Sequence, residues 1–86
     1  MLPTIDIPAT CMRIKALCEE KGYSAVRLQE SLGLESVQAV YKWFKGKNLP
    51  NIDNLVAIMY LMEVSFEDLV VLDEDRVDDL QDQREH

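Results

Sequence analysis

The sequence predicts an all-α fold: one compact five-helix domain with a short extended N-terminal arm and an acidic C-terminal tail. Apolar residues recur at helical spacing, and no stretch alternates with the period of two that is typical of a strand. Isolated Gly residues and Ser or Asn residues separate the apolar stretches at short intervals, as they do at helix ends. The chain has 86 residues, of which 48% are hydrophobic, so it is long enough for one modest core.

The arm, residues 1–8, contains Pro3 and Pro8. Proline lacks the N–H donor of a helix and restricts the residue before it, so an extended segment is expected. The first helix is expected over residues 9–21, and Gly22 follows it as a residue that ends a helix.

Two short helices, at about residues 24–32 and 36–45, are expected next. Ser24 and Ser36 have the side chain that most often caps a helix N-terminus. Gly33 tolerates the left-handed conformation that a tight turn between the two helices needs. The apolar residues that hold the pair together are expected to be Leu28, Leu32, Leu34, Val40 and Trp43.

A fourth helix is expected to begin at Asn51 or Asp53, and a short fifth helix at Ser65. The helical domain is therefore expected to cover residues 9–71. The acidic tail, residues 72–86, has few apolar residues and is expected to form a short helix or to stay solvated.

The net charge of −7 is distributed unevenly. Residues 63–86 contain ten acidic residues against two basic ones, whereas residues 1–62 contain six acidic and seven basic residues. A uniformly acidic protein would bind nucleic acid poorly. Residues 36–50, however, carry a basic patch without any acidic residue, formed by Lys42, Lys45 and Lys47.

Catalysis, cofactor binding and metal binding are not expected. The only His is His86, and the Gly residues are isolated, so the sequence offers neither a catalytic triad nor a phosphate-binding loop. Cys11 and Cys18 are seven residues apart, which is about 10 Å along a helix and too far for a disulfide. No His lies near these thiols to complete a zinc site.

Membrane association is not expected either. No apolar stretch approaches the length of a bilayer span, and the N-terminus lacks the pattern of a signal peptide. A cytoplasmic location is therefore predicted.

Residues 24–50 have the features of a DNA-reading helix-turn-helix, in which the second helix lies in the major groove. The outward side near the start of the second helix is expected to contact bases through Val37, Gln38, Tyr41 and Lys42. Side chains around its edges are expected to contact the DNA backbone, namely Arg27, Lys45, Lys47 and Asn48.

The segments LQESLGL, QAVYKWFKGKNLP and IDNLVAIMYLMEVSFEDLV occur in this order, and together they resemble the lambda-repressor/Cro-like (XRE-type) helix-turn-helix regulators. The resemblance covers about residues 12–71. It implies a five-helix lambda-repressor-like fold and a bacterial-type transcription regulator at the nucleoid that binds double-stranded DNA sequence-specifically. It matches Val37, Gln38, Tyr41 and Lys42 to base-reading positions, and Ser24 and Ser36 to the caps beside the DNA backbone.

Two departures from the family pattern concern the turn. Gln29 stands where members commonly have a small Ala, and Leu34 and Glu35 stand between Gly33 and Ser36, where one residue is usual. We expect the longer turn to let the two helices lie further apart around Gln29.

Two functions remain open from the sequence. The first is a transcription regulator that binds double-stranded DNA as a homodimer, because one such domain contacts few bases. The alternative is a protein-interaction module, an adaptor or antitoxin-like partner, that uses an acidic surface. The net charge, the acidic tail as a site for a protein partner, and the apolar Val37 at a reader position favour this alternative.

Overall fold

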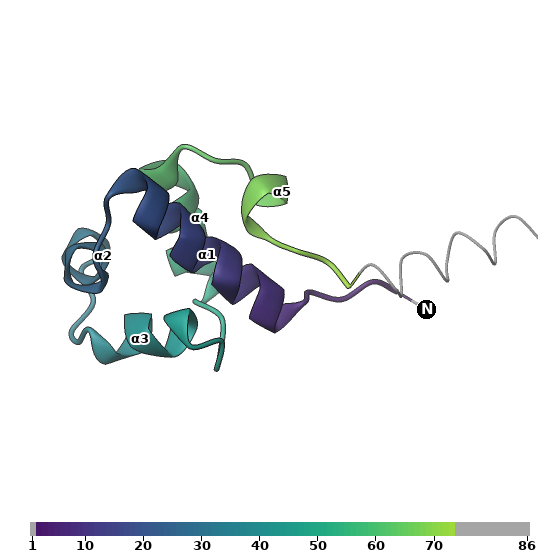
Figure 1. Ribbon diagram of the computed structural model, residues 1–86, viewed down its shortest axis with the longest axis horizontal. Helices are drawn as coiled ribbons and strands as arrows, with labels where there is room; N and C mark the ends of the chain where they lie inside the picture. Colours follow the sequence, from purple (N-terminus) through teal and green to yellow (C-terminus); the bar gives the residue numbers. More distant parts are fainter. Residues whose placement is uncertain (1, 74–86) are drawn as a thin grey trace, which may run out of the picture.

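The computed structural model describes residues 2–73, and Figure 1 shows the five helices of this part of the chain. They are α1 (Ile7–Lys21), α2 (Ala25–Leu32), α3 (Gln38–Phe44), α4 (Ile52–Met62) and α5 (Phe66–Leu69). Helix α1 lies at the centre and contacts α3, α4 and α5, while α2 contacts α3 and α4. The predicted all-α, five-helix architecture is confirmed. No helix within residues 2–73 is both long and apolar enough to cross a bilayer.

One core holds the helices together, and all five contribute to it. Leu28, Val40 and Trp43 are buried as predicted, and Leu32 and Leu34 are half-buried against them. The other buried members of the core are Ile14, Cys18, Leu55, Ile58, Met62, Leu69 and Val70.

Both thiols are buried and unpaired. Burial, with a smaller contribution from the neighbouring carboxylate of Glu19, raises the pKa of the Cys18 thiol to about 11. Burial also raises the pKa of the Cys11 thiol. Both side chains therefore pack as small, protonated apolar groups at neutral pH.

Helix α1 begins at Ile7, two residues before the start predicted at residue 9. Asp6 is its N-cap, because the backbone N–H of Ala9 donates to Oδ1 of Asp6 at 3.0 Å. Pro8 stands in the first turn, where the missing N–H would have no partner within the helix. The extended arm therefore ends at Asp6, not at Pro8 as predicted.

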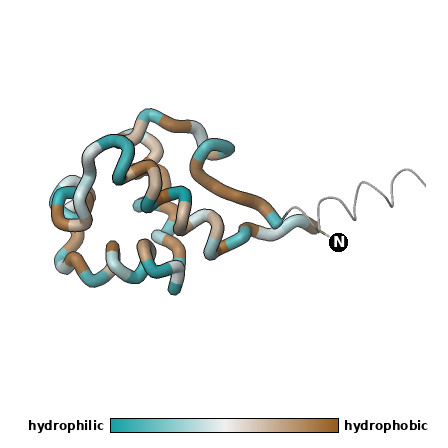
Figure 2. Tube along the Cα trace, viewed as in Figure 1, coloured by the Kyte–Doolittle hydropathy of each residue, from teal (hydrophilic) through white to brown (hydrophobic). Residues whose placement is uncertain are grey.

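The arm pairs with the chain that follows α5. Ile5 lies opposite Leu72 in an antiparallel bridge, and the flanking hydrogen bonds run from Asp6 N–H to the Val71 carbonyl and from Asp73 N–H to the Thr4 carbonyl, each 2.8 Å long. Figure 2 shows that this segment after α5 is hydrophobic, although Leu72 was predicted to begin the tail. The remainder of that predicted tail, 74–86, lies outside the described residues.

Candidate nucleic-acid interface

Helix α2 begins and ends as its sequence predicts. Ser24 is the N-cap, and its hydroxyl accepts from the Arg27 N–H at 3.1 Å. Gly33 ends the helix in the left-handed conformation with φ at 69°. The N–H groups of Gly33 and Leu34 then donate to backbone carbonyls in the last turn of α2, and each of these hydrogen bonds is 3.1 Å long. These hydrogen bonds fix the direction in which the chain leaves the helix.

The side chain of Gln29 closes the turn between α2 and α3. Its Nε2 donates to the carbonyl oxygen of Leu34, while the Leu34 N–H donates to the carbonyl oxygen of Gln29. Leu34 belongs to the lengthened turn, and its carbonyl therefore receives a partner that a small residue at position 29 would not supply. The two departures from the family pattern are connected by a hydrogen bond across the turn. Sequence reasoning linked them only through helix spacing and missed this role of the amide.

Helix α3 is short, and its rotation is fixed by the two side chains that it buries. Val40 and Trp43 face the core with at most 3% of their surface exposed. The opposite side carries Gln38, Tyr41 and Lys42, all of which are exposed. Residues spaced by three and four share one face of a helix, so these three side chains form one outward surface.

The fourth predicted base-reading residue, Val37, occupies a different position. It precedes α3 with backbone angles that are already helical, and its side chain is half-buried. Val37, not the predicted Ser36, is the N-cap of α3 and makes no side-chain cap hydrogen bond, although the hydroxyl of Ser36 accepts from the Gln38 N–H at 3.1 Å. Val37 therefore lies at the edge of the outward surface of α3.

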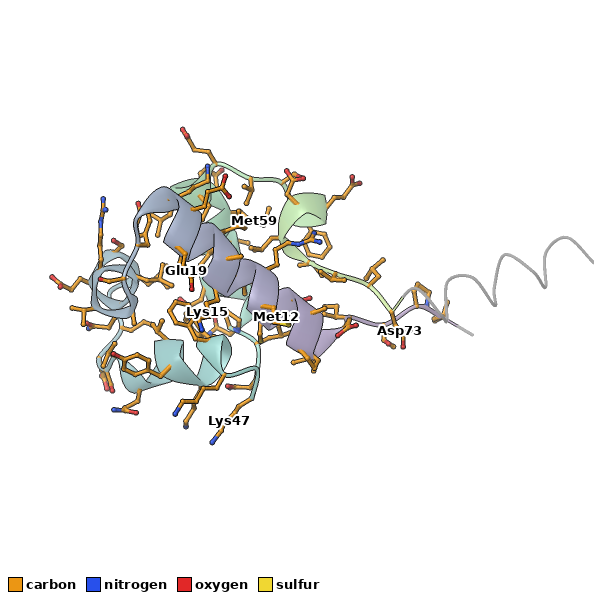
Figure 3. The ribbon with its side chains drawn as sticks, in the orientation of Figure 1. Met12, Lys15, Glu19, Lys47, Met59 and Asp73 are labelled. Atoms are coloured by element: carbon orange, nitrogen blue, oxygen red, sulfur yellow. The ribbon has the colours of Figure 1, made fainter. Side chains whose placement is uncertain are left out.

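The basic loop after α3 is tied to the body of the protein by its backbone. The Lys47 N–H donates to the Lys42 carbonyl at 3.0 Å, and the Cys11 thiol donates to the Asn48 carbonyl at 3.5 Å. The side chains of Lys45, Lys47 and Asn48 are exposed. Figure 3 shows the Lys47 side chain extending away from the body beside α3.

Arg27 lies at the junction of α1 and α2. Its guanidinium donates from Nη1 to the Gly22 carbonyl at 3.0 Å and lies 4.3 Å from the centre of the Tyr23 ring. These contacts hold the cation in place but use only part of the five donors of a guanidinium. The side chains of Arg27 and Ser24 are both exposed at the start of α2.

The charged residues of α3 and its flanking segments, residues 36–52, all have one sign. Residues 36–52 contain no acidic residue, so no carboxylate of this stretch neutralises its lysines. The exposed ammonium groups belong to Lys42, Lys45 and Lys47. An anionic backbone that approaches α3 therefore meets cations and hydrogen-bond donors without a competing carboxylate from the same stretch.

Of the comparisons with known proteins, only the one with protein families gives a match. No curated protein and no solved structure matches the chain. A family model described as helix-turn-helix matches residues 14–69, which is more than half of the chain. The matched range contains α2, the Gly33 turn and α3. The chain therefore belongs to the helix-turn-helix family of the lambda-repressor (XRE) type, a family of DNA-binding regulators.

Proposed function

We propose that this protein is a sequence-specific transcription regulator of the cytoplasm and nucleoid that reads double-stranded DNA with α3 in the major groove. The observation that carries the proposal is the orientation of α3. Val40 and Trp43 anchor one side in the core, so the polar side chains of Gln38, Tyr41 and Lys42 stand together on the other. A recognition helix requires this arrangement.

The outward side chains differ in the base contacts that they can make. The amide of Gln38 can donate to and accept from one adenine edge, and the ammonium of Lys42 can donate to guanine. Val37 and the ring of Tyr41, which is 41% exposed, offer apolar surface to a thymine methyl group. The proposed reading therefore combines two polar contacts with two apolar ones.

The proposed backbone contacts surround α3 on both sides. Lys45, Lys47 and Asn48 lie at its C-terminal end and in the loop beyond. Ser24, Arg27 and Ser36 lie at the starts of the two helices of the motif. Phosphate contacts of this kind position a protein on the duplex without reading its sequence.

We also propose that the protein binds as a homodimer. The described part of the chain presents one short recognition helix with few candidate base contacts, which limits the specificity of a single copy. Two copies on half-sites one helical turn apart double the number of bases read.

Two substitutions and a salt titration test the proposed reading. Lys45→Ala should weaken binding to all duplexes alike and reduce the slope of log K against log salt by about 0.9 per lost phosphate contact. Gln38→Ala should leave the slope unchanged and lower the preference for one base pair by about 1–3 kcal/mol.

The matched control is Arg13→Gln, which removes a cation at the side of α5 instead of α3. Arg13→Gln should change neither the slope of log K against log salt nor the preference for one base pair. If Arg13→Gln and Lys45→Ala reduce binding to the same extent, the cations act only through net charge, and α3 is not the DNA-binding surface.

A further inference from the structure

Helix α4 presents an apolar stripe that nothing in the described part of the chain covers. Ile52, Val56 and Tyr60 are 76%, 45% and 81% exposed. They are spaced by four residues, so they form one ridge about 12 Å long on a regular helix. Single exposed apolar residues are ordinary, but a row of three on one helix face is typical of a contact surface.

The ridge leads into a hollow at the C-terminal end of α4. This hollow has a volume of about 400 Å³ and is lined by Met59, Tyr60, Glu63 and Val64. Met59 is labelled in Figure 3, near the crossing of α1 and α4. Three of the four lining side chains are largely apolar, and Glu63 supplies a single carboxylate. Such a lining suits the aliphatic stem and cationic head of an Arg or Lys side chain.

The backbone of Glu63 is unusual. Glu63 has a left-handed conformation with φ at 57°, and it is the only residue other than Gly with a positive φ in the described part of the chain. Helices α1 and α2 end in the same way, but with Gly22 and Gly33 at the equivalent position. A residue with a Cβ is disfavoured there, so the side chain of Glu63 is present despite a cost in stability. Strain of this kind is found where a side chain serves a function.

The charged residues of the stretch that contains α4 and α5 all have one sign. Residues 48–73 contain no Lys or Arg. They contain five acidic residues, which are Asp53, Glu63, Glu67, Asp68 and Asp73. A cation from α1 lies beside α5, because the guanidinium of Arg13 donates from Nη1 to the backbone carbonyl of Asp68 at 3.2 Å. A partner that complements this surface therefore brings positive charge together with apolar side chains.

We propose that the α4 face, defined as Ile52, Val56, Met59, Tyr60, Glu63 and Val64, binds another protein through an amphipathic helix that carries an Arg or Lys. The apolar side of that helix covers the ridge of Ile52, Val56 and Tyr60. Its basic side chain enters the hollow, lies along the Tyr60 ring and pairs with the Glu63 carboxylate. These residues belong to α4 and to the two residues after it, not to α3, so the face adds a protein partner to the proposed DNA-binding function.

A second copy of this chain complements the face less well. A two-fold interface brings the same surface together on both copies. Each Glu63 would then need a cation from residues 48–73 of the other copy, and that stretch has none. Repulsion between the acidic residues of the two copies would oppose the contact between their apolar side chains. The charges therefore favour a different, basic partner.

Selection from a displayed library of helical peptides, with one face randomised, tests the proposal on the full chain. The enriched peptides should combine apolar residues at helical spacing with an Arg or Lys at one end. A synthetic copy of an enriched peptide should bind at least tenfold more weakly to Tyr60→Ser and to Glu63→Lys than to the unaltered protein. The control Glu35→Lys makes the same charge change in the α2–α3 turn and should alter binding less than twofold.

Three outcomes would overturn the proposal. They are the absence of any enriched peptide, enrichment without basic residues, and equal binding to Tyr60→Ser, given that circular dichroism shows the variants to be folded. A self-association of the unaltered protein that Tyr60→Ser abolishes would assign the face to a second copy instead. DNA affinity measured on Tyr60→Ser separates the two proposals, because it should stay unchanged whether or not peptides bind.

Discussion

At the scale of single residues, helix ends account for several of the specific features of this chain. Helices α1, α2 and α4 all end in a left-handed residue whose N–H, with that of the next residue, donates back to the last turn. Two of these residues are Gly and one is Glu63. The C-terminal ends of α1, α2 and α4 have equivalent hydrogen bonds. The end of α4 therefore differs from the other two mainly by the side chain of Glu63.

Replacement of Glu63 by Gly should therefore stabilise the protein. Relief of the left-handed conformation is worth about 1 kcal/mol in the free energy of unfolding, which corresponds to a rise in Tm of about 4–8 °C for a domain of this size. Thermal unfolding followed by circular dichroism measures it. Glu63→Ala is the control, since it removes the carboxylate and retains the strained Cβ. An equal rise in both variants would show that the carboxylate, not the backbone, is the cause.

At the scale of elements, the α2–turn–α3 unit depends on the packing of α3 and on the hydrogen bonds of the turn. Val40 and Trp43 determine which side of α3 faces outward. Gln29 and Gly33 determine the path between the helices. The positions proposed to read DNA are therefore set by residues that contact no DNA themselves.

The ribbon formed by the arm and residues 71–73 also depends on one buried side chain. The hydroxyl of Thr10, which has no exposed surface, donates to the Val71 carbonyl at 3.3 Å and accepts from the Val71 N–H at 2.9 Å. Thr10→Val keeps the shape and removes both hydrogen bonds. It should lower the free energy of unfolding by about 1–3 kcal/mol, because the Val71 N–H loses its acceptor, whereas the Val71 carbonyl still accepts from the Asp6 N–H.

Urea unfolding measures this loss, and Thr4→Val is the matched control. Thr4 is exposed and contributes its backbone carbonyl, not its side chain, to the ribbon. The control should change stability by less than about 0.5 kcal/mol. Equal effects of the two Thr→Val changes would mean that the Thr10 hydroxyl does not hold the ribbon to α1.

Local chemistry explains which elements were predictable from the sequence. Ser24, Gly33, Asn51 and Ser65 begin or end helices as expected, because a cap or a left-handed Gly acts on its immediate neighbours. The start of α1 was missed because Pro8 was assigned to the arm, although Asp6 two residues before it is a good N-cap.

Features that join distant segments were not predictable in the same way. The pairing of Ile5 with Leu72 and the hydrogen bonds of Thr10 with Val71 connect residues more than sixty positions apart. The left-handed Glu63 contradicts the usual preference for Gly, so no local rule points to it. Within the candidate site, the outward positions Gln38, Tyr41 and Lys42 followed from helical periodicity, whereas the half-buried Val37 and the engaged Arg27 did not.

At the scale of the whole molecule, the charges are separated. The lysines proposed to contact phosphate lie at α3 and the loop after it, whereas all charged residues of the stretch 48–73 are acidic. A net charge of −7 disfavours unspecific binding to DNA, and the basic patch at α3 gives the molecule one preferred orientation on a duplex. Residues 36–52 and residues 53–73 therefore carry charges of opposite sign, which suits partners of opposite charge.

The most direct test of sequence-specific reading by α3 is selection from a pool of random duplexes with the full chain at low salt. The proposed function predicts enrichment of one sequence arranged as two half-sites about 10 base pairs apart. Gln38→Ala should select the same arrangement with the preference relaxed at one symmetric position. Failure of the unaltered, folded protein to enrich any sequence would contradict the claim that α3 reads DNA.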